Sequence, residues 1–155
     1  QLFSSLEITY GDQIDYDNNR LGDLVELSSA INYSFNQHLE LDAYLTRSEL
    51  DFNSENVYVA DLVELRLSYQ FDVYSYLKLN LAFRNTDRNL ANNTDKSLLA
   101  TDKNLQTQLI YAYKLNPQTV FFLGYSDNSY QDDDIVSLKR DQRTLFTKVS
   151  YAWMP

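Results

Sequence analysis

Apolar and polar residues alternate with a period of two along most of this chain. In Val63–Phe71, read as VELRLSYQF, the odd-numbered residues are large and apolar or aromatic, and the even-numbered ones are polar. Successive side chains of a β-strand point to opposite faces, so this pattern predicts a strand with one apolar and one polar face. The sequence predicts eight such strands and no helix, at Leu6–Tyr10, Val25–Phe35, Leu39–Leu45, Val63–Phe71, Leu77–Phe83, Leu105–Tyr113, Phe121–Tyr125 and Leu145–Trp153.

The connections between these strands are expected to have two alternating lengths. Tight turns are predicted at Asn36–His38, Asp72–Tyr74 and Asn116–Gln118. Longer polar segments lie between them, at Gly11–Asp23, Ser48–Val57, Asn85–Asp102 and Asp127–Arg143. This alternation is typical of an antiparallel up-and-down meander of hairpins, with both termini on the tight-turn side. We therefore expect a single domain over residues 1–155.

One motif recurs where the predicted strands approach the tight turns. It reads INYSF, LSYQF, LIYAY and VSYAW, in each case an apolar residue followed by alternating aromatics, at intervals of roughly 40 residues. Tyr and Trp favour a membrane–water boundary, where the ring is buried and its polar tip stays hydrated. The motif predicts an aromatic girdle made of Tyr33, Phe35, Tyr69, Phe71, Tyr111, Tyr113, Tyr151 and Trp153. The opposite rim is expected to carry Tyr10, Tyr58, Phe83 and Tyr125.

Alternation alone does not say which face is concave. The interior of a closed eight-stranded barrel is just wide enough to be filled by side chains, so small residues suit it better than large ones. The small residues, such as Ala30, Ser68 and Ala82, lie on the polar face. That face also carries acids and bases that could neutralise one another in a lumen. The predicted lumenal charge network consists of Glu7, Glu26, Glu40, Asp42, Glu64, Arg66, Lys78, Arg84, Lys114 and Lys148.

Composition narrows the function classes. The net charge of −9 argues against nucleic-acid binding, which needs a basic surface, and the absence of Cys excludes disulfides and Cys-ligated zinc. The mean hydropathy of −0.45 is typical of soluble proteins, but the strands of transmembrane barrels are apolar only at every second position. Residue 1 is Gln and no signal-peptide core follows it. We expect that a signal peptide has been removed or that the chain is a piece of a longer one.

Candidate chemistry is sparse. His38 is the single histidine and falls in a predicted turn, so it is interpreted as a surface residue. Glu40 and Asp42 share a strand face and could act as a carboxylate pair, but neutralisation by lumenal Lys and Arg is the preferred interpretation. Asp132–Asp134 could bind a divalent cation, although the EF-hand spacing and glycine are missing, which favours a solvated loop. The sequence predicts no enzyme and no cofactor or metal site.

Two stretches of the last third carry a family resemblance. YKLNPQTVFFLGYSDN (Tyr113–Asn128) and DQRTLFTKVSYAW (Asp141–Trp153) resemble the end of a family of large Gram-negative outer-membrane proteins. Those proteins join an N-terminal domain similar to family 9 carbohydrate-binding modules to a C-terminal β-barrel of unassigned function. The resemblance implies an outer-membrane barrel. It implies no sugar binding here, because the carbohydrate-binding-like domain is absent from this chain.

These observations predict an all-β, antiparallel up-and-down transmembrane β-barrel of eight strands in the Gram-negative outer membrane. The expected role is that of a membrane anchor or scaffold with a charge-filled lumen. Its expected partners are the lipid bilayer and, during assembly, the barrel-insertion machinery. Two alternatives stay open. The chain could be part of a larger porin-like barrel that passes small solutes, or it could be a soluble lipocalin-like barrel with an apolar interior.

Overall fold

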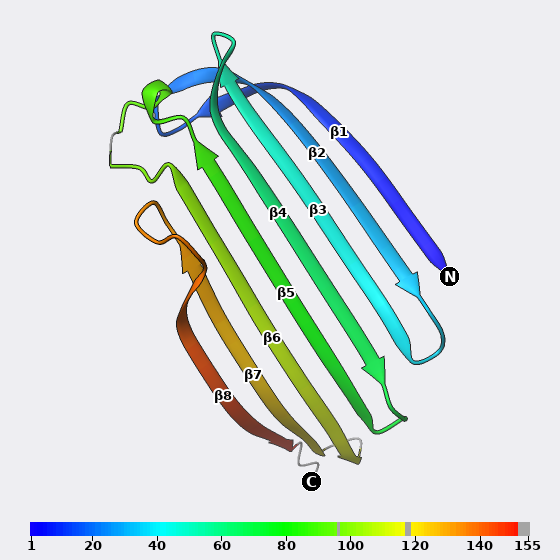
Figure 1. Ribbon diagram of the computed structural model, residues 1–155. Coiled ribbons are helices and arrows are strands. Elements are labelled where there is room, and N and C mark those ends of the chain that lie inside the picture. The colour runs from blue at the N-terminus through cyan, green and yellow to red at the C-terminus, as the bar shows by residue number, and fades with distance from the viewer. Residues whose placement is uncertain (96, 117–118, 152–155) are drawn as a thin grey trace.

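The computed structural model describes residues 1–95, 97–116 and 119–151, which form one antiparallel sheet in which each strand pairs with the next in sequence (Figure 1). A single 3-10 turn, η1 (Leu90–Asn92), is the only helical element among these residues. The all-β, up-and-down fold predicted from the alternation is therefore confirmed. The strands are β1 (Leu2–Asp15), β2 (Arg20–Ser34), β3 (Leu39–Phe52), β4 (Glu55–Gln70), β5 (Ser75–Arg88), β6 (Thr101–Asn116), β7 (Thr119–Gln131) and β8 (Lys139–Tyr151).

Two of the four predicted long connections are wrong. Strands β1 and β2 continue through most of Gly11–Asp23 and leave only residues 16–19 between them. Strands β3 and β4 continue through Ser48–Val57 to a two-residue turn, in which Asn53 and Ser54 have φ of 54° and 64°. Such left-handed pairs match the twist of a tight hairpin. The backbone hydrogen-bond ladder does not require apolar side chains, so these hairpins extend beyond their apolar segments.

The predicted tight turns at Asn36–His38 and Asp72–Tyr74 are confirmed, whereas the third turn lies partly outside the described residues. Both described turns use the same device, a side-chain oxygen that accepts backbone N–H groups two and three residues ahead. Asn36 Oδ1 accepts from His38 N at 2.8 Å and from Leu39 N at 2.9 Å. Asp72 Oδ1 accepts from Tyr74 N at 2.7 Å and from Ser75 N at 2.8 Å. Each turn is thereby fixed by its own first polar residue.

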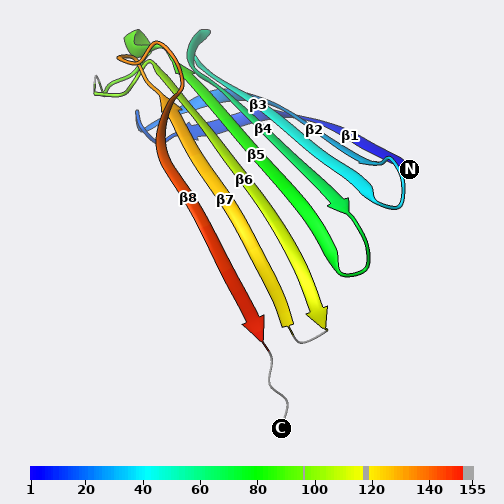
Figure 2. The same cartoon turned by 60° about the horizontal axis from the view of Figure 1, so that its bottom comes forward.

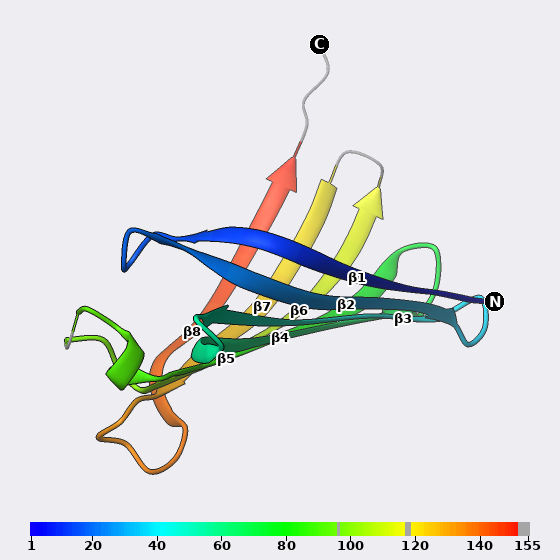
Figure 3. The same ribbon diagram turned by 90° about the horizontal axis from the view of Figure 1, so that it is seen from above.

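The sheet curves but does not close. Strands β1 and β8 are its two edges, and they do not pair with one another (Figure 1). Seen from two further directions, the strands form a twisted, open trough whose two edges stay apart (Figure 2, Figure 3). The described strands therefore do not form the closed eight-stranded barrel that the sequence predicts. The alternating pattern specifies the two faces of each strand, but it does not specify where the outermost strands find partners.

The described part of the loop between β5 and β6, residues 89–95 and 97–100, is fastened to the ends of the first two hairpins. Arg20 donates from Nε to Asp15 Oδ2 at 2.9 Å and from Nη2 to the carbonyl oxygen of Asn92 at 2.6 Å. Asn93 is 4 % exposed and donates from Nδ2 to the carbonyl oxygen of Val57 at 3.3 Å. Val57 and Leu50 are fully buried there, and they form the largest part of a very small core. This cluster, the loop clamp, ties three connections together at one end of the sheet.

Candidate functional site: an oblique apolar belt and a polar hollow

The register shows that apolar residues share one face across the whole sheet. Residues directly opposite each other in antiparallel strands project from the same face. Starting at Leu2, successive opposite partners are apolar or aromatic in every strand. This row consists of Leu2, Tyr33, Leu41, Leu67, Leu79, Leu109, Tyr125 and Leu145.

The same face carries an apolar belt that is bounded by polar residues toward the longer loops. In β6 the belt runs from Leu105 to Tyr113, nine residues, and a transmembrane strand needs about 9–11 residues. No outward-facing member of the belt is charged in the part of the chain that the structure describes. The belt comprises the outward-facing residues of Leu2–Tyr10, Val25–Tyr33, Leu39–Leu45, Val63–Tyr69, Leu77–Phe83, Leu105–Tyr113, Phe121–Tyr125 and Leu145–Tyr151. The next position on this face is polar in every strand: Asp12, Asp23, Arg47, Asp61, Asn85, Lys103, Asp127 and Arg143.

The belt crosses the strands obliquely. On β1 its loop-side limit, Tyr10, lies eight residues beyond Leu2, whereas on β8 the limit is Leu145, the row partner of Leu2. A drift of eight residues is about 26 Å, and it accumulates over seven strand spacings of about 34 Å in total. These lengths give an angle of about 38° between the belt and the row of opposite partners. This angle is within the tilt of roughly 35–45° that strands adopt in outer-membrane barrels. The turn-side limit drifts the same way, from Leu2 on β1 to Tyr151 on β8.

Belt side chains are exposed to an extent that a soluble core would not allow. The edge strands are extreme, with Leu6 69 %, Leu145 73 % and Val149 65 % exposed. Among the described residues only Leu50, Val57 and Ala112 are buried hydrophobic residues. A continuous apolar surface of this kind is typical of a face that contacts lipid or another protein.

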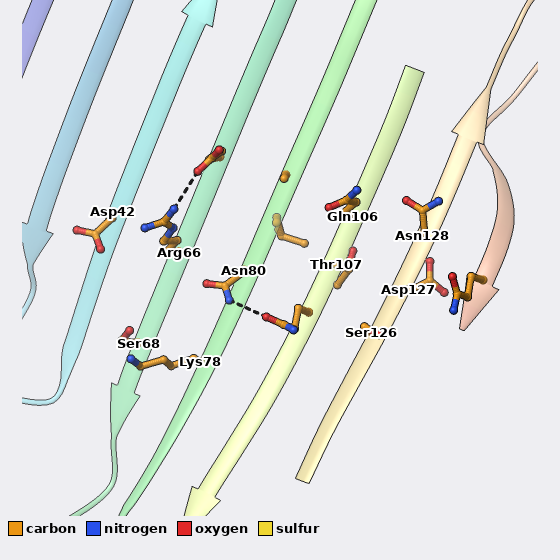
Figure 4. Close-up of a pocket in the computed structure, with 15 residues that line it drawn as sticks. Asp42, Arg66, Ser68, Lys78, Asn80, Gln106, Thr107, Ser126, Asp127 and Asn128 are labelled. Atoms are coloured by element: carbon orange, nitrogen blue, oxygen red, sulfur yellow. Dashed lines mark hydrogen bonds and ion pairs between the residues drawn. The ribbon is translucent and has the colours of Figure 1, made fainter. Parts of the chain in front are cut away.

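The opposite face is polar and concave. It contains a hollow of about 720 Å³ whose lining is dominated by polar and charged side chains from β3 to β8 (Figure 4). Asp42, Arg66, Lys78, Asn80 and Gln106 all contribute to it. Because every one of these residues occupies the register position opposite to the belt, the polar face is the inner one. The sequence argument from small residues predicted this same orientation.

All ten residues of the predicted lumenal charge network lie on the concave face, but few of them pair with one another. Arg66 and Glu64, neighbours along β4, are 3.1 Å apart and form the one ion pair between network members among the described residues. Other members use partners that the sequence analysis did not include. Asp42 accepts from Asn32 at 2.7 Å, Glu26 from Ser48 at 2.7 Å, and Arg84 pairs with Asp102 at 3.1 Å.

Side-chain amides supply much of the remaining polarity on this face. Asn80 donates to Gln108 at 3.2 Å across β5 and β6, and Asn104 donates to Asn128 at 3.1 Å across β6 and β7. The lining therefore changes from mostly charged residues on β3–β5 to mostly neutral polar residues on β6–β8, where Asp127 is the charged exception. The sequence signal for these amides is the run of Asn and Gln at alternate positions, which charge alone does not reveal.

The predicted girdle aromatics lie on the belt face at its turn side. Tyr33 and Phe35 pack edge to face with centroids 4.4 Å apart, and Tyr69 and Phe71 do so at 4.8 Å. Phe71 also reaches Tyr111 on β6, at 6.3 Å. Trp153 lies outside the described residues. On the opposite rim, Tyr10, Phe83 and Tyr125 follow the belt face, whereas Tyr58 pairs with Arg88 on the concave side, so its assignment to the rim is corrected.

The residues considered for chemistry have structural contacts. His38 Nδ1 lies 2.7 Å from the carbonyl oxygen of Gln70 and so links the two tight turns. Asp133 accepts the backbone N–H groups of Ala100 at 2.7 Å and Thr101 at 2.6 Å, which ties one loop to the next. No group of three or more His, Cys, Asp or Glu in the described ranges is arranged to hold a metal ion. None of the helical residues described is part of a helix long and apolar enough to cross a membrane.

No protein-family model, curated protein or solved structure matches this chain. The two faces of the sheet are therefore the basis for inferring its function.

Proposed function

We propose that this chain forms the wall of a membrane-embedded β-barrel in the Gram-negative outer membrane. The apolar belt faces the lipid tails, and the concave polar face lines the lumen. The observation that carries the proposal is the oblique course of the belt. In a bilayer the belt must lie flat. Its angle of about 38° to the rows of opposite partners, which run across the strands, therefore requires the strands to tilt by that angle, as they do in known barrels.

The same geometry argues against a soluble lipocalin-like barrel. That alternative needs the apolar face on the inside, where a ligand would bind. Here the hollow is lined by residues such as Asp42, Arg66 and Gln108, and the apolar residues project from the outside. A water-exposed belt of this extent would promote association of the protein rather than keep it soluble.

The proposed orientation follows from the two rims. The girdle aromatics and tight turns face the periplasm, and the longer connections at residues 89–100 and 132–138 face outward, as in outer-membrane barrels. Delivery by the barrel-insertion machinery is part of this proposal.

Two roles fit such a wall. A scaffold or anchor needs only the belt, and no residue constellation for catalysis appears among the described contacts. A solute-conducting barrel is a second candidate, and the open edges favour it. Strands β1 and β8 leave their outer hydrogen-bonding groups without strand partners, so additional strands would widen the ring beyond eight.

A paired substitution tests the proposed membrane function. Leu67→Arg places a charge in the middle of the belt, whereas Ser68→Arg places the same charge on the concave face one residue away. Reversible unfolding from phospholipid vesicles should show a loss of about 2–4 kcal/mol for Leu67→Arg and a much smaller change for Ser68→Arg. Equal effects of the two substitutions, or a stable detergent-free monomer of the unmodified chain, would contradict the proposal.

A further inference from the structure

We propose that Arg140 and Arg143 on β8 bind the phosphate of an anionic lipid headgroup at the loop-side rim of the belt. This inference rests on the proposed membrane function and adds a specific lipid contact to it. Both residues belong to β8 and lie beyond Leu145, the last apolar position of the belt on that strand.

A β-bulge places the two arginines on one face. Asn128 pairs with Gln142, but its neighbour Ser129 pairs with Arg140, so Asp141 has no opposite partner in the ladder. In a regular strand, residues three apart project from opposite faces. The extra residue brings Arg140 onto the belt face beside Arg143, and bulges commonly redirect side chains in this way.

The carboxylate of Asp127 contacts the guanidinium groups of both arginines. Its Oδ2 lies 2.5 Å from Arg140 Nε and 3.9 Å from Arg143 Nε, and it also accepts from the Tyr125 hydroxyl at 3.0 Å. Asp127 is only 13 % exposed, while the arginines are 54 % and 55 % exposed. The carboxylate thus engages the inner nitrogens. The outer guanidinium nitrogens form no other ion pair with the described residues, which suits bidentate binding of a phosphate.

The local charge contrasts with the rest of the chain. Two arginines share one carboxylate, so the pair is net positive on a protein with a net charge of −9. The other arginine of the same rim is differently arranged. Arg47 Nη1 donates to both carboxylate oxygens of Asp61, at 3.0 and 3.3 Å, and the two residues form a neutral one-to-one pair. The rim therefore has one positive patch rather than an even distribution of cations.

The height of the patch identifies the ligand as a lipid rather than a soluble anion. Asp127 and Arg143 are the first polar positions beyond Tyr125 and Leu145, the outermost belt residues of their strands. With the belt in the hydrocarbon core, these side chains lie at the depth of the headgroup phosphates. Long cationic side chains at this level extend into the headgroup region.

The test uses the full chain folded into phosphatidylcholine vesicles that contain spin-labelled phosphatidylglycerol or spin-labelled phosphatidylcholine. The wild type should select the anionic label by about fivefold or more at low salt, since each cation near the surface contributes about that factor. Arg143→Gln should lower the selectivity several-fold, and the double variant Arg140→Gln/Arg143→Gln should bring it close to one. Arg47→Gln removes a charge from the same rim at a distance of several strands and should leave the selectivity unchanged.

Four results would overturn the inference, and they are distinguishable. Equal losses in Arg47→Gln and Arg143→Gln would show diffuse attraction to the rim rather than a site. Saturable binding of inorganic phosphate by the detergent-solubilised protein, lost in Arg143→Gln, would identify a site for a free anion. Failure of the wild type to enter vesicles of either composition would remove the proposed membrane function itself, whereas insertion without lipid selectivity would remove only this site.

Discussion

The ring of Phe146 on β8 covers the backbone of Gly124 on β7, its opposite partner on the concave face. A Cβ atom added at Gly124 would overlap three atoms of that ring. The ring occupies the space that a side chain at position 124 would need, so it would have to move aside, and no unusual backbone angle is involved. Gly124→Ala should therefore destabilise the sheet by about 1–3 kcal/mol, the usual cost of overpacking.

A double-mutant cycle in reversible unfolding checks this relationship. Phe146→Leu shortens the ring that causes the overlap, so Gly124→Ala in that background should cost clearly less than in the wild type. Additive effects of the two substitutions would show that the ring does not confine Gly124. Gly11→Ala is the matched control, because a Cβ atom there meets nothing within 4 Å.

The loop clamp provides a second prediction. Arg20 is 20 % exposed and joins Asp15 to Asn92 across more than 70 residues of chain. Arg20→Ala should cost about 1.5–3 kcal/mol, because it leaves a buried carboxylate without its charged donor. Limited proteolysis should then cut within residues 89–100 much faster than in the wild type. Arg47→Ala, which removes an exposed ion pair, should cost about 0.2–1 kcal/mol and leave that loop protected.

The tight turn at Asp72 should make a pH-dependent contribution to stability. The backbone N–H of Tyr74, assisted by Ser75, lowers the pKa of Asp72 below its ordinary value of 3.8. A carboxyl whose folded pKa is depressed stabilises the fold above its unfolded pKa and loses that contribution as the pH falls through the folded pKa. The stability difference between wild type and Asp72→Ala should be constant above about pH 5 and narrow below about pH 4. A difference that widens on acidification would contradict this sign.

The sequence was sufficient to predict the two faces of the sheet, because a strand has a fixed period of two. Leu67 and Arg66 were assigned to opposite faces, and the register places them there. Strand ends were less predictable. Ser48–Val57 reads as a polar connection, yet it continues the ladder up to Asn53 and Ser54, since backbone pairing tolerates polar side chains.

Features that depend on contacts between strands could not be predicted. The alternation at Arg140–Arg143 suggests opposite faces, and only the pairing of Ser129 with Arg140 reveals the bulge that aligns them. The partners of Asp42 and Arg84 are Asn32 and Asp102, which lie on neighbouring strands whose register the sequence alone does not specify. The sequence also could not predict that β1 and β8 stay unpaired, because a strand has the same alternating pattern in an open sheet and in a closed barrel.

The central claim is that the oblique belt lies flat in a bilayer, and depth measurements with single spin labels test it most directly. The chain has no native cysteine, so labels can be placed at Leu2, Tyr10, Leu67 and Leu145 in turn. Leu2 and Leu145 belong to the same row of opposite partners, and Tyr10 lies eight residues away from that row on β1. The proposal predicts that Leu67 is deepest, that Tyr10 and Leu145 lie at the same shallow depth in one leaflet, and that Leu2 lies near the opposite surface. Equal depths for Leu2 and Leu145, or high accessibility of Leu67 to a water-soluble relaxation agent, would contradict it.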